Sequence, residues 1–125
     1  IALSTDGTVS EGAGENIFVI KDGVVYTPGA AASILTGITR HSVMVLAKEA
    51  GIEIVQQSIP REMLYIADEI FLTGTAAEIT PVRSVDRLPV GNSERGEITK
   101  RLQDVFFGLF SGKTDDKWGW LTALK

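Results

Sequence analysis

Two carboxylates in a run of small residues are the first candidates for chemistry in this chain. Glu11 and Glu15 lie within residues 10–16, separated by Gly12-Ala13-Gly14. Two acids at this spacing can be metal ligands, an acid–base pair, or members of a polar loop. The residue types alone leave these three alternatives open.

Two other segments can bind an anion through backbone N–H groups. Gly37-Ile38-Thr39 opens a predicted helix, whose first N–H groups lack partners and whose dipole favours negative charge. Gly74-Thr75-Ala76-Ala77 follows a predicted buried strand and leaves N–H groups free at its carboxyl end. A phosphate fits both segments, but capping of the helix and a plain turn after the strand explain them equally well.

Three further motifs do not support a function. Residues 108–114 are one residue short of a phosphate-binding P-loop and follow a predicted helix where the P-loop follows a strand. Gly12-Ala13-Gly14 begins a dinucleotide fingerprint, but Ile17 occupies the third glycine position and a strand comes next. His41 has no Ser or Asp arranged around it for a hydrolytic triad, so we interpret it as a surface or capping residue.

Composition excludes several classes of protein. The 125 residues include no Cys and a single His, which leaves no disulfide, no thiolate site and no two-histidine zinc motif. The net charge of -4 argues against a nucleic-acid or anionic-membrane surface. No apolar run approaches the roughly 18 residues that span a bilayer. The length suits one domain.

The elements that must position the candidate segments are mostly strands. In the first helix, Ile38, Val45, Leu46 and Ala50 recur at helical spacing and predict one apolar stripe, and Pro81 is expected at a strand start or on an edge strand. The sequence thus predicts a single mixed α and β domain. Strands are predicted over residues 1–5, 8–10, 17–20, 24–27, 52–56, 69–73 and 79–85, long helices over 37–50 and 97–110, and a short helix over 61–67.

Taken together, the candidate segments resemble one family. Ser10-Glu11-Gly12-Ala13-Gly14-Glu15-Asn16-Ile17-Phe18, Leu35-Thr36-Gly37-Ile38-Thr39-Arg40 and Gly74-Thr75-Ala76-Ala77-Glu78-Ile79-Thr80-Pro81-Val82 look like the pyridoxal-phosphate enzymes of the branched-chain amino acid aminotransferase group, of fold type IV and class IV. Phe106-Phe107-Gly108-Leu109-Phe110 and Lys117-Trp118-Gly119-Trp120-Leu121 resemble the branched-chain transaminases in particular. The resemblance extends from about Leu3 to Leu121.

The resemblance implies a fold, an activity, binding partners and a cellular location. The expected fold is α+β, a strand-rich pseudo-barrel with two long helices packed on it, and residues 1–125 would form the C-terminal cofactor-binding domain. The full-length protein is expected to transfer the amino group of leucine, isoleucine or valine to 2-oxoglutarate. Its partners are these small amino acid and 2-oxo acid substrates and further copies of itself in a homo-oligomer. It is expected in the cytoplasm, and neither a nucleic acid nor a membrane is expected as a partner.

The cofactor implied is pyridoxal 5′-phosphate, and the resemblance assigns roles to individual residues. Glu11 faces the pyridine nitrogen, where a carboxylate keeps that nitrogen protonated. Leu35 packs against one face of the ring, and Glu15 has a structural role. The implied cofactor-binding residues are Glu11, Leu35, Gly37, Ile38, Thr39 and Thr75, and the implied substrate-binding residues are Thr75, Ala76 and Ala77.

The family's Schiff-base lysine has no counterpart within the chain. It precedes the block that starts at Ser10, so its position would fall ahead of Ile1, and the lysines present are interpreted as solvated. The chain is therefore expected to be a fragment that lacks an N-terminal domain and is inactive alone. Alternatives are a D-amino acid transaminase or an aminodeoxychorismate lyase of the same fold, against which the Trp118-Gly119-Trp120 segment argues, and a non-catalytic binding module.

Overall fold

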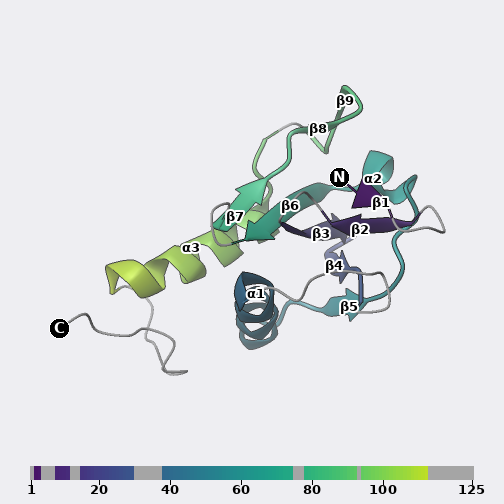
Figure 1. Cartoon of the computed structure of the whole chain (residues 1–125). Coiled ribbons are helices and arrows are strands. Elements are labelled where there is room, and N and C mark those ends of the chain that lie inside the picture. Colours follow the sequence, from purple (N-terminus) through teal and green to yellow (C-terminus); the bar gives the residue numbers. More distant parts are fainter. Residues whose placement is uncertain are drawn as a thin grey trace.

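A five-stranded mixed sheet organises the chain (Figure 1). The computed structural model describes residues 2–3, 8–11, 15–29, 38–74, 78–92 and 94–112. The strand order is β5-β4-β3-β6-β7, and every neighbouring pair is antiparallel except β4 and β5. The strands are β3 (Asn16–Lys21), β4 (Val24–Thr27), β5 (Ile54–Gln56), β6 (Glu69–Gly74) and β7 (Glu78–Pro81).

The hairpin of β3 and β4 turns at Asp22 and Gly23. Both residues have positive φ, 52° and 79°, which is the geometry of a two-residue turn that matches the twist of the flanking strands. The carboxylate of Asp68 accepts a hydrogen bond from the backbone N–H of Asp22 at 2.8 Å. The turn is thereby tied to the segment that leads into β6.

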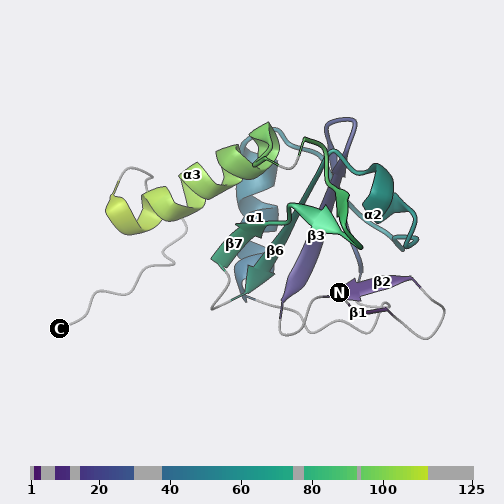
Figure 2. The same cartoon turned by 90° about the horizontal axis from the view of Figure 1, so that it is seen from above.

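Two long helices, α1 (Ile38–Glu49) and α3 (Glu97–Ser111), cover one face of the sheet (Figures 1 and 2). Gly51 and Gly112 follow them with φ of 75° and 80°, the left-handed conformation that ends a helix. The predicted stripe of α1 is partly wrong, because Ala50 is exposed. The core on this face contains Phe18, Ile20, Val25, Val43, Leu46, Ala47, Ile52, Phe71, Ile79, Leu102 and Phe106.

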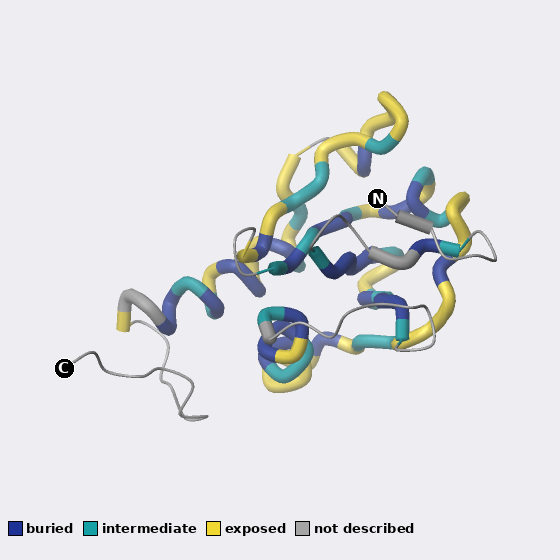
Figure 3. The backbone as a smooth tube through the Cα atoms, viewed as in Figure 1, coloured by how far each residue is buried: buried dark blue, intermediate teal, exposed yellow. Residues whose placement is uncertain are grey.

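Short elements cover the opposite face. The backbone N–H of Val9 donates to the carbonyl of Ile59 at 2.8 Å, which holds β2 over the sheet. Figure 3 shows the central strands buried and the β8–β9 hairpin largely exposed. These elements are β1 (Ala2–Leu3), β2 (Val9–Glu11), α2 (Met63–Ile66), β8 (Ser84–Val85) and β9 (Leu88–Pro89), and the core beneath them contains Val9, Ile17, Val19, Ile59, Leu64, Ala67, Ile70 and Val90.

The α+β class with two long helices on a strand-rich layer is confirmed, and one predicted strand is corrected. Residues 79–85 form two short strands rather than one. Pro81 is the last residue of β7, which is an edge strand as expected for a proline, because a residue without an N–H is tolerated there. The N–H of Val82 still donates to the carbonyl of Ile70 at 2.8 Å, after which the chain leaves the sheet.

Candidate functional site

One end of each of the five strands lies along the same end of the sheet. Because β3 is antiparallel to both β4 and β6, its start lies beside their ends, as Figure 2 shows for β3 and β6. Gly74 pairs with Glu78 across β6 and β7, so the two ends of the 74–78 segment lie there too. We call this end of the sheet, where the strands begin or end, the site edge. Its strand-terminal residues are Asn16 of β3, Thr27 of β4, Gln56 of β5, Gly74 of β6 and Glu78 of β7.

The first turn of α1 is attached to the site edge by Arg40. Its Nη2 donates to the carbonyl of Pro28 at 3.0 Å, directly after β4, and to Oε1 of Gln56 at 3.4 Å. Arg40 is only 6% exposed, and this burial lowers the pKa of its guanidinium. The free N–H groups at the start of α1 are thus brought to the strand ends.

Buried polar side chains are concentrated in this part of the fold. Seven polar or charged residues among those described are buried, and five of them belong to the ends of strands at the site edge or to the first turns of α1. At least two of the five are hydrogen-bonded within the chain, since the Thr27 hydroxyl donates to the carbonyl of Ile17 at 2.8 Å and Arg40 donates to the carbonyl of Pro28, so the clustering makes this part of the fold polar. The seven are Asn16, Thr27, Arg40, Ser42, Thr73, Thr99 and Gln103.

Three local features make the site edge suitable for an anionic ligand. Glu78 has φ of 55°, a left-handed conformation that is uncommon for a residue other than glycine and is often found at functional sites. The hydroxyl of Thr73, next to Gly74, is fully buried and has no hydrogen-bond partner among the described residues. α1 also carries no acidic residue in its first turn, so no carboxylate there neutralises the positive end of the helix dipole. The site edge therefore fits a phosphate group.

The predicted site residues fall into three groups. Thr39 is half-buried as the second residue of α1. Glu11 is the last residue of β2 and Ile38 the first of α1, each described by its backbone alone. Leu35, Gly37, Thr75, Ala76 and Ala77 lie outside the described residues.

The structure brings two of the predicted segments near one another, namely the start of α1 and the ends of β6 and β7, and the assignment of individual site residues stays a prediction. Residue 38 begins the helix that Arg40 attaches to the site edge, and residues 75–77 join two strands that both reach this edge. Arg40 and Thr73 were missed by sequence reasoning. Arg40 stood inside the Leu35–Arg40 block, and Thr73 ends the strand predicted over residues 69–73, but neither residue type signals that its side chain is buried.

Other predictions about individual residues have mixed outcomes. His41 is exposed, as expected. Lys21 is not freely solvated, because its ammonium lies 3.5 Å from the carboxylate of Asp68. Gly112 ends α3 with positive φ, which supports a helix C-terminus rather than a P-loop over residues 108–114.

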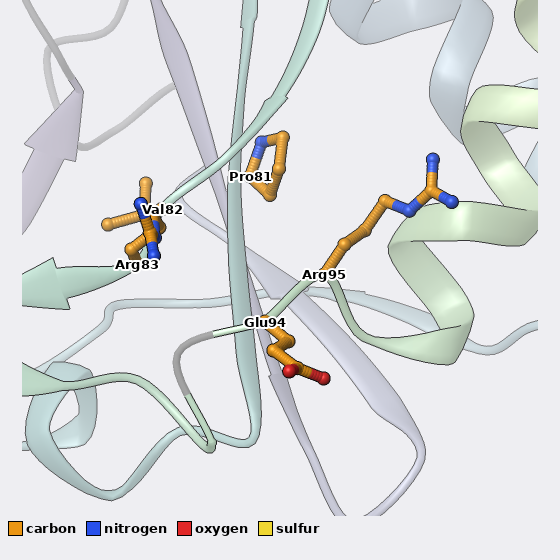
Figure 4. A pocket seen from close by; sticks show the side chains of 5 residues that line it. All are labelled: Pro81, Val82, Arg83, Glu94 and Arg95. Carbon is orange, nitrogen blue, oxygen red and sulfur yellow. The ribbon is translucent and has the colours of Figure 1, made fainter.

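A cavity of about 310 Å³ lies away from the site edge, beyond the last residue of β7. Figure 4 shows Arg83 and Arg95 on opposite sides of this cavity, with their guanidinium groups directed apart. Nη1 of Arg95 donates to Oε1 of Gln103 at 3.0 Å. These side chains do not converge on a common ligand position.

Metal clusters and membrane-spanning helices are both absent from the described residues. No group of three or more His, Asp or Glu side chains is placed to hold a metal ion in that part of the chain. None of its helices combines the length and the apolar character needed to cross a membrane.

Comparison with known proteins defines the class. The family described as amino-transferase class IV matches residues 1–85, and the chain belongs to this family. The curated relatives it resembles are branched-chain-amino-acid aminotransferases. That of Salmonella typhimurium is 60% identical over 121 residues, which cover 97% of this chain and 39% of the relative. That of Pseudomonas aeruginosa is 51% identical over 123 residues, 98% of this chain and 40% of the relative.

Solved structures give the same result. The branched-chain amino acid aminotransferase from Escherichia coli matches with a TM-score of 0.95 and 60% identity, over 98% of this chain and 41% of that one. The enzyme from Thermobaculum terrenum, in its PLP-bound holo form, matches with a TM-score of 0.91 and 39% identity, over 96% of this chain and 39% of that one. The chain thus spans about two fifths of the length of these relatives.

Proposed function

We propose that this chain forms the cofactor-binding part of a pyridoxal-phosphate-dependent aminotransferase that acts on branched-chain amino acids. The observation that carries the proposal is the site edge, where strand ends, the start of α1 and most of the buried polar side chains come together. The names of the relatives support the reaction, and the PLP-bound form of one structural neighbour supports the cofactor.

Phosphate binding is assigned to the start of α1 and to the segment after β6. The N–H groups of Ile38 and Thr39 and the Thr39 hydroxyl would donate to the phosphate, with Gly37 allowing close approach. Thr75 would supply the second contact. Both segments use backbone N–H groups that are available because a helix begins or a strand ends there.

Glu11 and Leu35 are assigned to the ring of the cofactor. When bound, pyridoxal phosphate supplies an electron sink for cleavage of the substrate Cα–H bond. The carboxylate of Glu11 would hold a proton on the pyridine nitrogen, since a nearby negative charge stabilises the protonated ring. Leu35 would pack against one ring face and exclude water from it.

The substrate is assigned to residues 75–77. The N–H groups of Thr75, Ala76 and Ala77 would bind the substrate carboxylate, which amino acids and 2-oxo acids share. We also propose that residues 1–125 act as a C-terminal domain in a cytoplasmic homo-oligomer. In that protein the catalytic lysine would lie outside these 125 residues, so the chain alone would be inactive.

Binding of the amine form of the cofactor tests the phosphate site without a measurement of enzymatic activity. Pyridoxamine 5′-phosphate suits this test because it cannot condense with surface lysines. We expect saturable binding to the 125-residue chain by calorimetry, competition by inorganic phosphate, and much weaker binding of pyridoxamine. Equal affinities for pyridoxamine 5′-phosphate and pyridoxamine would overturn the proposal.

A variant pair localises the phosphate. Thr39→Val removes the hydroxyl donor and should weaken pyridoxamine 5′-phosphate binding by about fivefold to tenfold. Lys48→Ala, at the exposed far end of α1, is the matched control and should leave binding unchanged. Equal affinities of the two variants would remove α1 from the phosphate site.

Substrate choice requires the longer protein that contains this chain. We expect it to transfer amino groups from leucine, isoleucine and valine to 2-oxoglutarate. Activity with D-alanine or aminodeoxychorismate in their place would favour one of the two related enzymes of the same fold.

A further inference from the structure

Arg40 is a buried cation with an incomplete set of partners. It is 6% exposed, and its two hydrogen-bond acceptors are the carbonyl of Pro28 and the amide oxygen of Gln56. Both acceptors are neutral, and Nε has no hydrogen-bond partner in the part of the chain that the structure describes. Arg40 takes part in none of the ion pairs formed by Lys21 and Arg61, and the lowered pKa of its guanidinium has burial as its cause and no nearby carboxylate among the described residues.

An uncompensated buried charge is costly, and it is retained where a counter-charge offsets it. Arg40 lies in the first turn of α1, where the helix dipole already produces a positive potential. Since the first turn contains no acidic residue, the two positive contributions add. The location therefore favours an anion from outside the described residues.

We propose that Arg40 is a positioning residue for the phosphate group of the cofactor, an inference that rests on the proposed function. Its guanidinium holds the start of α1 against the ends of β4 and β5, and its unneutralised charge strengthens the potential at the free N–H groups of that helix. Arg40 acts through α1 and through its field, without being required to touch the phosphate.

A charge-placement experiment separates the electrostatic role from a structural one. Gln56→Glu keeps the size of the side chain and places a carboxylate within reach of Arg40 Nη2, since the Gln56 oxygen already lies 3.4 Å away. Gln57→Glu adds the same charge one residue later, on an exposed side chain whose backbone N–H bonds to Thr27. Gln57 thus provides the matched control.

We expect Gln56→Glu to weaken pyridoxamine 5′-phosphate binding by about tenfold, while Gln57→Glu changes it by less than about twofold. Pyridoxamine should bind equally to both variants and to the unaltered chain. Gln56→Glu should not lower the unfolding midpoint in urea, because it gives Arg40 a counter-charge. Equal phosphate-dependent binding by the two variants would overturn the role of Arg40.

Direct replacement of Arg40 adds a second readout. Arg40→Met removes the charge at similar length, and Arg40→Lys retains it without the planar fork. We expect Arg40→Met to lose about tenfold in the ratio of pyridoxamine 5′-phosphate to pyridoxamine affinity, and Arg40→Lys to recover most of that ratio. If Arg40→Met unfolds, the Gln56 and Gln57 pair still decides the question.

Failures of the two proposals can be told apart. Absence of phosphate-dependent binding by the unaltered chain would overturn the phosphate site itself and Arg40 with it. Normal binding by the unaltered chain, together with an unchanged affinity ratio in Arg40→Met or in Gln56→Glu, would overturn the role of Arg40 alone.

Discussion

The carboxylate of Glu69 accepts a hydrogen bond from the backbone N–H of Thr99 at 2.8 Å, joining the first residue of β6 to the first turn of α3. Its other oxygen accepts from the N–H of Ile98 at 3.3 Å. Gly96, the residue that precedes α3, makes no side-chain cap of its own. A side chain distant in sequence thus caps this helix and neutralises part of its dipole.

Removing this cap should destabilise the protein. We expect Glu69→Ala to lower the free energy of unfolding by about 1 to 2 kcal/mol, because two N–H groups lose their acceptor and the helix dipole loses a counter-charge. Urea denaturation measures the change. Glu53→Ala removes an exposed acid ahead of β5 and is the control, expected to cost less than about 0.5 kcal/mol.

The cap also explains why residue 96 is a glycine. A Cβ atom at Gly96 would overlap the side chain of Glu69. Gly96→Ala should therefore displace the Glu69 carboxylate and cost about 1 to 2 kcal/mol. In Glu69→Ala the overlap disappears, so the double variant should cost little more than Glu69→Ala alone. Fully additive losses in urea denaturation would contradict this explanation.

A cross-strand aromatic pair fills the centre of the core. Phe18 and Phe71 pair directly across β3 and β6, and their rings stack with centroids 4.8 Å apart. Because both side chains are fully buried, Phe71→Ala should cost about 3 to 5 kcal/mol and Phe71→Leu about 1 to 2 kcal/mol. Leu88→Ala, on an exposed side chain, should change unfolding by less than about 0.5 kcal/mol. A small loss in Phe71→Ala would contradict the observed packing.

Stability below pH 4 should depend on Asp86. Hydrogen bonds from Tyr65 and then from Arg61 lower the pKa of this carboxyl from its usual 3.8. With the folded pKa below the unfolded one, the contribution is fully present above pH 3.8 and is lost as the pH falls through the folded pKa.

The expected contribution is small, because the Asp86 side chain is 57% exposed. Asp86→Asn should flatten the acid side of the stability profile, measured as urea midpoints between about pH 2 and 5. Tyr65→Phe should have a similar effect, and Asp104→Asn, on the exposed surface of α3, should leave the profile as it was. A steeper acid loss in Asp86→Asn would contradict the sign of the shift.

The strands and long helices were predicted well where the signal is local. A continuous apolar run over residues 17–20 and the Asp22-Gly23 pair indicate the β3–β4 hairpin, and a stripe at helical spacing indicates α3. The prediction failed over residues 79–85, where the strand-like pattern continued although the chain leaves the sheet after the hydrogen bond from Val82 to Ile70. It also placed Ala50 in the apolar stripe of α1, but Ala50 is exposed, because the direction of burial depends on how the helix crosses the sheet.

For the candidate site, local motifs identified the candidate segments, and the fold determined that the start of α1 lies near the end of β6. Gly37-Ile38-Thr39 and Gly74-Thr75 were each ambiguous, since helix starts and strand ends are common without a ligand. Their assembly depends on β3 lying antiparallel between β4 and β6, which long-range pairing alone establishes.

The sequence by itself determined the elements, the family resemblance and the absence of cysteine chemistry, because these depend on residue type and short-range spacing. Only the tertiary structure decided that Glu69 caps α3, that Arg40 is buried against Pro28 and Gln56, and that the buried Thr73 hydroxyl has no hydrogen-bond partner within the described ranges. Each of these is a contact or a burial between residues whose elements meet through packing, so no local pattern could specify it.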